Sequence, residues 1–187
     1  MNDITILAIV GSLRSKSFNR QLALQAQRLC GEHVHFKLLD YQMIPFMNED
    51  LEHPAPASIQ RIREEVAAAD GIWFFTPEYN HSYPGVLKNP LDWLSRPDEQ
   101  GTLVLHGKPA AISGISPGMS GTLLSQDLLV MLLSFLNMKI MNLPRLTIPN
   151  AHQQVKDDTL ILKESLPYLQ KQYDAFISYI KQSMGQS

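Results

Sequence analysis

The stretch ITILAIVGSLRSKSFNR, residues 4–20, decides the fold of this chain. Its first part, ITILAIV (4–10), is a continuous apolar run rich in β-branched residues, and it stops at a single glycine, Gly11. Runs of this kind are typical of a parallel strand that is covered on both faces. A helical pattern begins at Phe18, so the residues between Gly11 and Phe18 are predicted to form a turn that joins a strand to a helix.

The predicted turn carries side chains that can hold an anion. These are Ser12, Arg14, Ser15, Ser17 and Asn19. A strand-to-helix turn directs free backbone N–H groups and the positive end of the helix dipole outward, which favours a phosphate group. The P-loop and GxGxxG patterns are both absent, because Gly11 is the only glycine in the turn. The turn therefore predicts a site for a terminal monophosphate. The alternative is a polar turn in which Ser17 caps the helix.

The rest of the chain repeats the alternation of strand and helix. Further strands are predicted at residues 33–40, 71–76, 110–115 and 138–142. Helices are predicted at residues 18–30, 58–69 (capped by Ser58), 84–96, 119–136 and 157–182, and a proline-containing loop at 41–57. Five strands that alternate with helices predict a parallel, doubly wound α/β sheet with right-handed crossovers.

Length and composition agree with an ordinary globular protein. The chain has 187 residues, of which 44% are apolar and 18% are charged, and this suits one domain, 1–187, with a sizeable core. The net charge of -2 gives no electrostatic argument for binding nucleic acid or an anionic membrane. No apolar run approaches the roughly 18 to 20 residues of a membrane helix. The lack of a signal-like N-terminus and the single cysteine, Cys30, predict a cytoplasmic protein.

The predicted topology selects three loops as the ligand site. Ligands of a doubly wound sheet bind beyond the carboxyl ends of the strands, near the point where the strand order reverses. The loops at these strand ends are residues 11–18, 77–83 and 116–119. Ser, Asn, Glu, Gly and Pro concentrate in the same three loops, so composition and topology indicate one site.

The second loop has the composition of a site for a flat heterocycle. Pro77 and Pro84 stiffen its backbone by fixing two φ angles. The side chains of Glu78 and Asn80 can read the polar edge of a ring. Aromatic surface for the ring to lie beside is offered by Tyr79, His81 and Tyr83. These aromatic residues can also pack on a neighbouring subunit, and the two interpretations are compatible.

The helix after this loop carries a proline inside its pattern. Pro90 requires that the helix proper start near Asn89 or that the helix bend at the proline. Lys88 and Asp92 are four residues apart, so they can form an ion pair on the helix surface or build a subunit contact.

The third loop contains a GxSxG pattern, GISPG (114–118), between a predicted strand and a predicted helix. This is the context of a hydrolase nucleophile elbow, whose oxyanion hole uses the backbone N–H of the residue after the serine. Here that residue is Pro117, which has no N–H. The hydrolase interpretation is therefore rejected, and Ser116 is predicted to be a neutral hydroxyl that faces the same crevice.

The histidines give no recognisable metal pattern. None of the six forms HExxH or another compact ligand set. His33 and His35 lie on one side of a predicted strand, but two ligands alone are a weak signal. No metal is predicted.

Taken together, GSLRSKSFN (11–19), TPEYNHSYPGVLKNPLDWLSRP (76–97) and SGISPG (113–118) resemble the NADPH-dependent FMN reductase family. Its quinone, chromate and azo-dye reductases are the most similar members. The resemblance implies a flavodoxin-like three-layer α/β sandwich with a five-stranded parallel sheet in the order 2-1-3-4-5. It also implies FMN in the crevice between the three loops.

The resemblance assigns cofactor-binding residues in two groups. Around the phosphate it places Ser12, Arg14, Ser17, Phe18 and Asn19. Around the isoalloxazine it places Pro77, Glu78, Tyr79, Asn80 and His81, with Ser116 near the far edge. The chain departs from the family pattern after Gly118, where it reads MSGTLLSQ in place of a Gly-Gly pair and an arginine. The flavin carries the chemistry, so no protein acid or base is predicted.

The function implied by the resemblance is ping-pong hydride transfer from NAD(P)H through FMN to a small-molecule electron acceptor. The acceptor is expected to be a quinone, an azo dye, a free flavin or a metal oxyanion. The alternatives are a non-enzymatic electron carrier of the flavodoxin type and a redox-sensing binding module. Such carriers are strongly acidic, and the net charge of -2 argues against that class. The family also implies a homodimer or homotetramer, for which loop 79–83 and helix 119–136 offer surface.

Overall fold

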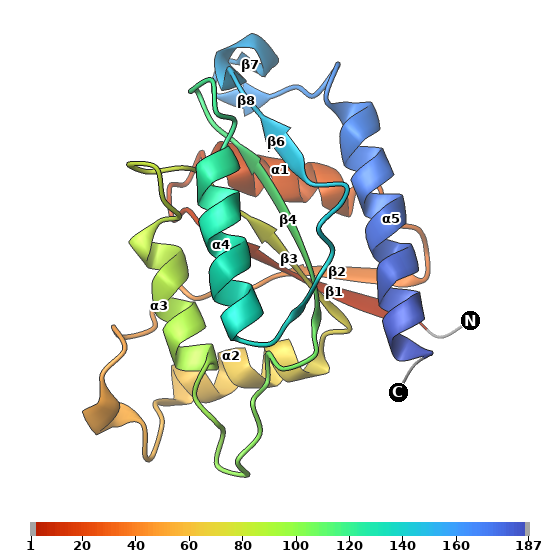
Figure 1. The fold of residues 1–187 in the computed structure, drawn as a ribbon. Helices are drawn as coiled ribbons and strands as arrows, with labels where there is room; N and C mark the ends of the chain where they lie inside the picture. Colours follow the sequence, from red (N-terminus) through yellow and green to blue (C-terminus); the bar gives the residue numbers. More distant parts are fainter. Residues whose placement is uncertain (1–2, 186–187) are drawn as a thin grey trace.

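A parallel β-sheet runs through the centre of the computed structural model, which describes residues 3–185 (Figure 1). The strands are β1 (Ile4–Val10), β2 (Val34–Leu38), β3 (Gly71–Phe75), β4 (Pro109–Ile115), β5 (Lys139–Ile140) and β6 (Leu146–Ile148). The order is β2-β1-β3-β4-β5, with β6 also paired to β4, and each of these pairs is parallel. The predicted flavodoxin-like sheet is thereby confirmed.

Helices cover both faces of the sheet and form the outer layers (Figure 1). They are α1 (Phe18–Gln27), α2 (Ala57–Ala68), α3 (Gly85–Leu94), α4 (Leu123–Phe135) and α5 (Leu166–Met184). Helices α1 and α5 pack on one face, while α2, α3 and α4 pack on the other. Two short 3-10 segments, η1 (Glu49–Leu51) and η2 (Ala151–Gln154), lie in the connections. Within residues 3–185, no helix has the length and apolar character needed to cross a membrane.

The apolar run of β1 feeds two cores because successive strand side chains point to opposite faces. Ile6 and Ala8 pack toward α1 and α5, whereas Leu7 and Ile9 pack toward the opposite helices. All four side chains are nearly inaccessible to solvent. Full burial of one large aliphatic side chain stabilises a fold by about 1.5–3 kcal/mol, so this strand anchors both layers.

The carboxyl ends of β1, β3 and β4 lie side by side, as the strand order requires. The N–H of Gly11 donates to the carbonyl of Phe75 at 2.8 Å, and the N–H of Thr76 donates to the carbonyl of Ser113 at 2.9 Å. The three predicted ligand loops therefore leave the sheet from one edge.

The fifth strand differs from its prediction at 138–142. Two short strands share the edge of β4: β5 pairs with Pro109 and Ala110, and β6 pairs with residues 113–115. Pro144 lies between β5 and β6 and has no N–H to donate to a ladder. The edge position is therefore filled by two separate segments.

The last helix begins later than the predicted residue 157. Instead, β7 (Val155–Lys156) and β8 (Thr159–Leu160) form an antiparallel hairpin. Asp157 and Asp158 occupy its turn with positive φ angles of 49° and 60°, a conformation that Asp tolerates better than most residues. Helix α5 starts at Leu166 with Pro167 in its first turn, where the missing N–H of proline is harmless.

Other helix boundaries also needed correction. Pro56, not Ser58, occupies the N-cap of α2. Helix α3 begins at Gly85, close to the predicted start at residue 84, and Pro90 lies inside it; of the two options for Pro90, the start near Asn89 is wrong. Helix α4 begins at Leu123 rather than at residue 119, because Gly121 and Thr122 have positive φ angles of 56° and 77°. Helix α1 ends at Gln27 rather than at residue 30.

Candidate functional site

Two serines of the first loop accept hydrogen bonds from backbone N–H groups of the loop and of α1. Ser17 is the N-cap of α1, and its hydroxyl oxygen accepts a hydrogen bond from the N–H of Arg20 at 3.3 Å. Ser12 accepts one from the N–H of Arg14 at 3.4 Å. The capping role considered for Ser17 is confirmed, and it fixes the direction in which α1 leaves the loop.

The start of α1 retains donors for an anion. Within residues 3–185, no protein group accepts a hydrogen bond from the backbone N–H of Phe18 or of Asn19. Arg14 and Lys16 add two exposed cations beside them, and the guanidinium of Arg14 lies 5.4 Å from the centre of the Phe18 ring. Free N–H groups, a helix dipole and two cations together fit a phosphate group.

Both cations of this loop are paired with one carboxylate from the β7–β8 hairpin. Arg14 Nη2 lies 3.3 Å from Asp158 Oδ1, and Lys16 Nζ lies 2.8 Å from Asp158 Oδ2. Lys16, followed by Arg14, holds the pKa of the Asp158 carboxyl below its usual value. Sequence reasoning missed both Lys16 and Asp158. The available signal was the Asp157-Asp158 pair between two short β-prone segments, which is a hairpin turn pattern.

Asn19 ties the first loop to the third. Its buried amide donates from Nδ2 to the carbonyl oxygen of Ile115 at 3.0 Å, and its Oδ1 accepts from the N–H of Ile115 at 3.1 Å. Both polar groups of the side chain are thus engaged by the end of β4. Only the backbone N–H of Asn19 is left to bind the predicted phosphate.

The second loop ends in a tight hairpin turn. The N–H of Tyr79 donates to the carbonyl of Ser82 at 2.9 Å, and the reverse bond measures 3.0 Å. Asn80 and His81 lie between them with φ angles of 51° and 61°, which is the signature of a type I′ turn. The Tyr79 residue is 54% exposed and the His81 side chain is 81% exposed, so this tip offers two aromatic rings to a ligand.

The carboxylate of Glu78 bonds to other residues of the protein and does not face the predicted crevice. Its Oε1 accepts from the hydroxyl of Ser120 at 2.9 Å, and its Oε2 accepts from the N–H groups of Leu124 and Ser125 at 3.1 and 3.2 Å. The side chain is only 9% exposed. The carboxylate caps the first turn of α4 and interacts favourably with its dipole. The predicted contact with a ring edge would have to come from the backbone here.

Pro77 and Ser116 are held from inside the protein. The carbonyl oxygen of Pro77 accepts from the hydroxyls of Thr76 and Ser125, both at 2.9 Å. Ser116 is buried, its N–H donates to the carbonyl of Ile148 at 3.1 Å, and its hydroxyl lies 3.5 Å from the carbonyl oxygen of Gly118. Both residues hold their loops in place at the edge of the sheet.

A close approach of backbones brings the second and third loops together at Gly114. A Cβ atom added there would lie 2.1 Å from Oγ1 of Thr122 and 2.4 Å from the carbonyl oxygen of Thr76. Only glycine fits between these atoms. Loop 76–83, the end of β4 and the start of α4 therefore share one packed junction.

The first loop also borders a cavity of about 430 Å³ on its outer side. The lining residues include Ser12, Arg14, Arg20, Asp40 and Tyr41. This cavity lies on the β2 side of β1, whereas the second and third loops follow β3 and β4. It therefore adjoins the predicted phosphate site and is separate from the crevice predicted for the ring.

His33 and His35 share one partner. Nδ1 of His33 lies 3.0 Å and Nε2 of His35 lies 3.2 Å from the carboxylate of Asp3. Among residues 3–185, no group of three or more His, Cys, Asp or Glu side chains is arranged to hold a metal ion.

Comparisons with known proteins point to one family. The model of the NADPH-dependent FMN reductase family matches residues 4–153. An NAD(P)H-dependent FMN reductase of Pseudomonas aeruginosa is 39% identical to this chain, and the alignment covers 98% of this chain and 99% of that protein. A 2-hydroxy-1,4-benzoquinone reductase of a Burkholderia species is 35% identical, with coverage of 95% and 97%.

A solved structure agrees with these sequence relatives. FerB, a flavoenzyme NAD(P)H:(acceptor) oxidoreductase from Paracoccus denitrificans, superposes with a TM-score of 0.85 at 35% identity. The match covers 96% of this chain and 98% of that one. The chain belongs to the NADPH-dependent FMN reductase family, and it is an oxidoreductase that uses FMN with NAD(P)H as the electron donor.

Proposed function

We propose that this protein passes electrons from NAD(P)H to a small-molecule acceptor, and that a quinone is the first acceptor to test. An azo dye, a free flavin or a metal oxyanion are further candidates of the same class. Two relatives at 35% identity are named a 2-hydroxy-1,4-benzoquinone reductase and a quinone reductase, and this supports the choice. The proposed order is ping-pong, in which the donor leaves before the acceptor enters the same space.

The observation that carries the proposal is the anion site at the start of α1. The free N–H groups of Phe18 and Asn19 and the cations Arg14 and Lys16 fit the phosphate of FMN, with Ser12 and Ser17 shaping the turn. When bound there, FMN supplies the two-electron chemistry that no side chain of the protein provides. The residues of the chain bind and orient it.

The ring of the cofactor is proposed to extend from this site toward the tip of the second loop. Tyr79 and His81 offer exposed aromatic surface there, and the backbone of Pro77 and Asn80 lies beside them. Ser116, at the end of β4, borders the far edge. The packed junction at Gly114 keeps this border in place before any ligand arrives, which lowers the entropic cost of binding.

A non-enzymatic carrier of the flavodoxin type is the second candidate, with a redox-sensing module as a variant of it. The net charge of -2 gives a carrier little means of steering toward a protein partner. Turnover of NAD(P)H with a small acceptor, in the absence of any other protein, distinguishes an enzyme from both alternatives.

The deciding experiment is anaerobic mixing of the FMN-reconstituted protein with NADPH or NADH. The absorbance of the flavin should bleach rapidly and recover when benzoquinone is added. Double-reciprocal plots with varied benzoquinone should be parallel. Slow or absent bleaching with both donors would overturn the proposed activity, and persistently intersecting plots would overturn the ping-pong order.

We extend the proposal to the oligomer: the outer face of α4 is expected to join two copies of this chain as a homodimer, or as the dimer unit of a homotetramer. An exposed apolar stripe runs along this helix. It comprises Leu124, Leu128, Met131 and Phe135. The spacing of 4, 3 and 4 residues places these side chains on one helical face, and exposed apolar patches of this kind mark interaction sites.

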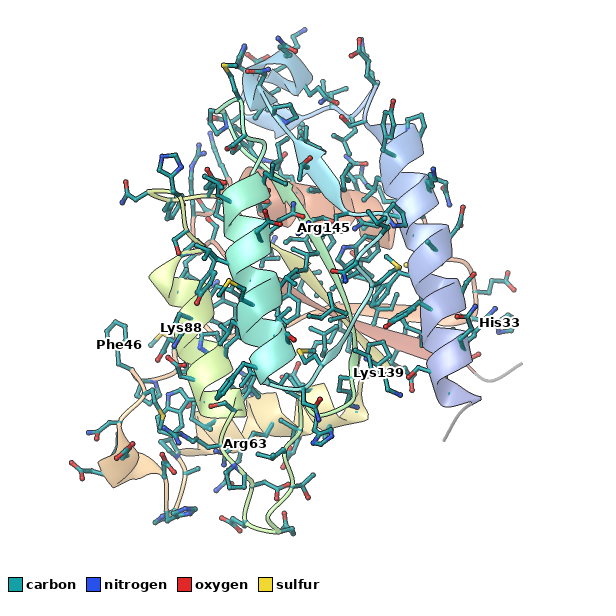
Figure 2. The ribbon with its side chains drawn as sticks, in the orientation of Figure 1. His33, Phe46, Arg63, Lys88, Lys139 and Arg145 are labelled. Carbon is teal, nitrogen blue, oxygen red and sulfur yellow. The ribbon has the colours of Figure 1, made fainter. Side chains whose placement is uncertain are left out.

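Charges beside the stripe favour a second copy as its partner. Lys88 and Asp92 pair at 2.5 Å on α3, and Arg145 pairs with Asp127 at 2.8 Å. Figure 2 shows Lys88 and Arg145 on opposite sides of α4. A surface with both signs of charge around an apolar stripe can complement itself across a two-fold axis. A monomer in sedimentation velocity at micromolar concentration would reject this proposal.

Two further expectations stay proposals. The chain from 1 to 187 is proposed to act as one FMN-binding domain, which the packing of both core clusters on one sheet supports. The predicted cytoplasmic location is likewise a proposal, and cell fractionation with a periplasmic and a cytoplasmic marker tests it.

A further inference from the structure

We propose that Asp158 is an affinity-determining residue of the phosphate site, because its carboxylate and the phosphate of FMN compete for Arg14 and Lys16. The inference rests on the proposed FMN site and names a regulator of its affinity. The β7–β8 hairpin would thus lower the affinity of the protein for FMN.

The carboxylate reaches both cations at once. Its Oδ1 is 3.3 Å from Nη2 of Arg14, and its Oδ2 is 2.8 Å from Nζ of Lys16. These are the two cationic side chains of the loop between β1 and α1. A single anion therefore engages both cations of the proposed phosphate site.

The hairpin is fixed to the helix whose start forms that site. Nε2 of Gln21 donates to the backbone carbonyl of Asp158 at 2.9 Å, and Oε1 of Gln21 accepts from the N–H of Leu160 at 2.8 Å. Leu160 is buried in the core beside α1. Because Gln21 lies in the first turn of α1, these bonds hold the backbone of Asp158 beside that turn.

The geometry of the turn directs this carboxylate. Asp157 and Asp158 both have positive φ, but of these two acids only Asp158 forms ion pairs with the described residues of the chain. The two acids thus share a turn, a charge and a backbone conformation, but they differ in their contact with the loop. The chain itself supplies a matched control.

Charge decides the direction of the effect. A phosphate monoester carries between about -1.5 and -2 charges at pH 7, and Asp158 adds a like charge beside its site. The Asp158 carboxyl stays ionised near neutral pH, because the ammonium of Lys16 and the guanidinium of Arg14 hold its pKa below the usual value. Exposed ion pairs have small interaction free energies, so the competition by Asp158 should have a modest effect. Removing the carboxylate should tighten FMN binding about fivefold in low salt.

The test compares Asp158→Asn with Asp157→Asn, both of which keep a residue that tolerates positive φ. FMN is titrated into each flavin-free protein, and the quenching of flavin fluorescence gives Kd. Asp158→Asn should bind FMN about fivefold more tightly than wild type, and the gain should shrink in high salt. Asp157→Asn should bind as wild type does.

Riboflavin and inorganic phosphate supply two further readouts. Riboflavin has no phosphate, so its affinity should be the same in both variants and in wild type. Inorganic phosphate should raise the melting temperature of Asp158→Asn more than that of Asp157→Asn. An equal gain for riboflavin and FMN would indicate a structural effect and overturn the inference.

The inference and the proposed function fail in different ways. If Asp158→Asn binds FMN no more tightly than Asp157→Asn does, Asp158 does not compete with the phosphate and the inference is rejected. The proposed function stands in that case. Failure of the wild-type protein to bind FMN rejects the proposed function. The comparison of melting temperatures in inorganic phosphate then decides the inference alone.

Discussion

The side-chain amide of Asn19 and the backbone of Ile115 form two hydrogen bonds with each other, at 3.0 and 3.1 Å, in the interior of the protein. The pair joins the start of α1 to the end of β4. It couples the loop that holds the proposed phosphate to the loop that borders the proposed ring.

Replacing Asn19 by leucine should therefore destabilise the protein. The change keeps the approximate size of the side chain but leaves the N–H and carbonyl of Ile115 unpaired. Each unsatisfied buried group is expected to lower the free energy of unfolding by about 1–3 kcal/mol. Urea unfolding followed by circular dichroism measures the change. The same substitution at the exposed Gln42 is the control and should stay within about 0.5 kcal/mol of wild type; equal effects at both positions would contradict a structural role for the pair.

Removal of the Glu78 carboxylate should loosen α4. Glu78→Ala leaves two N–H groups of the helix without an acceptor, and loss of such a cap lowers the free energy of unfolding by about 0.5–2 kcal/mol. Glu78→Gln should lose less, since it keeps one oxygen acceptor. Hydrogen exchange of the amides of Leu124 and Ser125 reports the local effect. Glu99→Ala, at an exposed acid, should leave these two amides unchanged.

A methyl group at Gly114 should be strongly destabilising. It would meet Oγ1 of Thr122 at 2.1 Å and the carbonyl oxygen of Thr76 at 2.4 Å, and overpacking of this kind lowers stability by about 1–3 kcal/mol. Shortening Thr122 to glycine in the same chain should restore only part of the loss, because the backbone oxygen stays. Gly85→Ala, where no atom lies within 4 Å of the added Cβ, is the control. Thermal unfolding that is unchanged in Gly114→Ala would contradict the packed junction.

Cys30 should react slowly with thiol reagents. Burial raises the pKa of its thiol above the ordinary 9.0, so the thiolate that attacks a disulfide reagent is scarce at neutral pH. The rate with an aromatic disulfide should reach half its maximum above pH 9.0 in the folded protein, and near that value in urea. The unfolded chain loses this proton first as pH rises, so the thiol contribution to stability is present below pH 9.0 and declines above it. A folded-state midpoint below that of the unfolded chain would contradict the prediction.

Charge on the α4 stripe should separate the proposed dimer. Met131 and Phe135 are 69% and 85% exposed, and glutamate at either position would bring like charges together across a two-fold interface. Sedimentation velocity should show a monomer for both variants. Tyr168→Glu alters an exposed aromatic residue on α5 and should leave the dimer intact; dissociation by this control as well would remove the assignment to α4.

The long strands were accessible from the sequence because buried parallel strands leave continuous apolar runs, whereas the strand order came from the resemblance to a known family. The run at 4–10 needs no partner to be recognised, and the same is true of the fully buried β3 and β4. Strands of two or three residues leave no such pattern. The split edge strand, the β7–β8 hairpin and the late start of α5 depend on contacts with β4 and α1, which lie far away in the sequence.

The location of the candidate site was also predictable from the sequence, whereas the hydrogen-bond partners of its individual residues were not. Topology placed the loops at one edge of the sheet. Asn19 and Glu78 have the side chains of ligand-binding residues, but their polar atoms bond to Ile115 and to the start of α4. Asp158 entered the site from a segment predicted to be helical. Hydrogen-bond partners more than 40 residues away are a property of the folded chain, and local patterns carry no information about them.

The type I′ turn at the tip of the second loop has a consequence for protein engineering. The turn is closed by two backbone hydrogen bonds between Tyr79 and Ser82, so its shape does not depend on the Tyr79 ring, and His81 needs only a residue that accepts positive φ. Substitution libraries at Tyr79, combined with Asn, Asp or Gly at His81, should therefore leave the melting temperature nearly constant. If the proposed site is correct, the same libraries should change the range of accepted substrates, so that selectivity and folding can be varied independently.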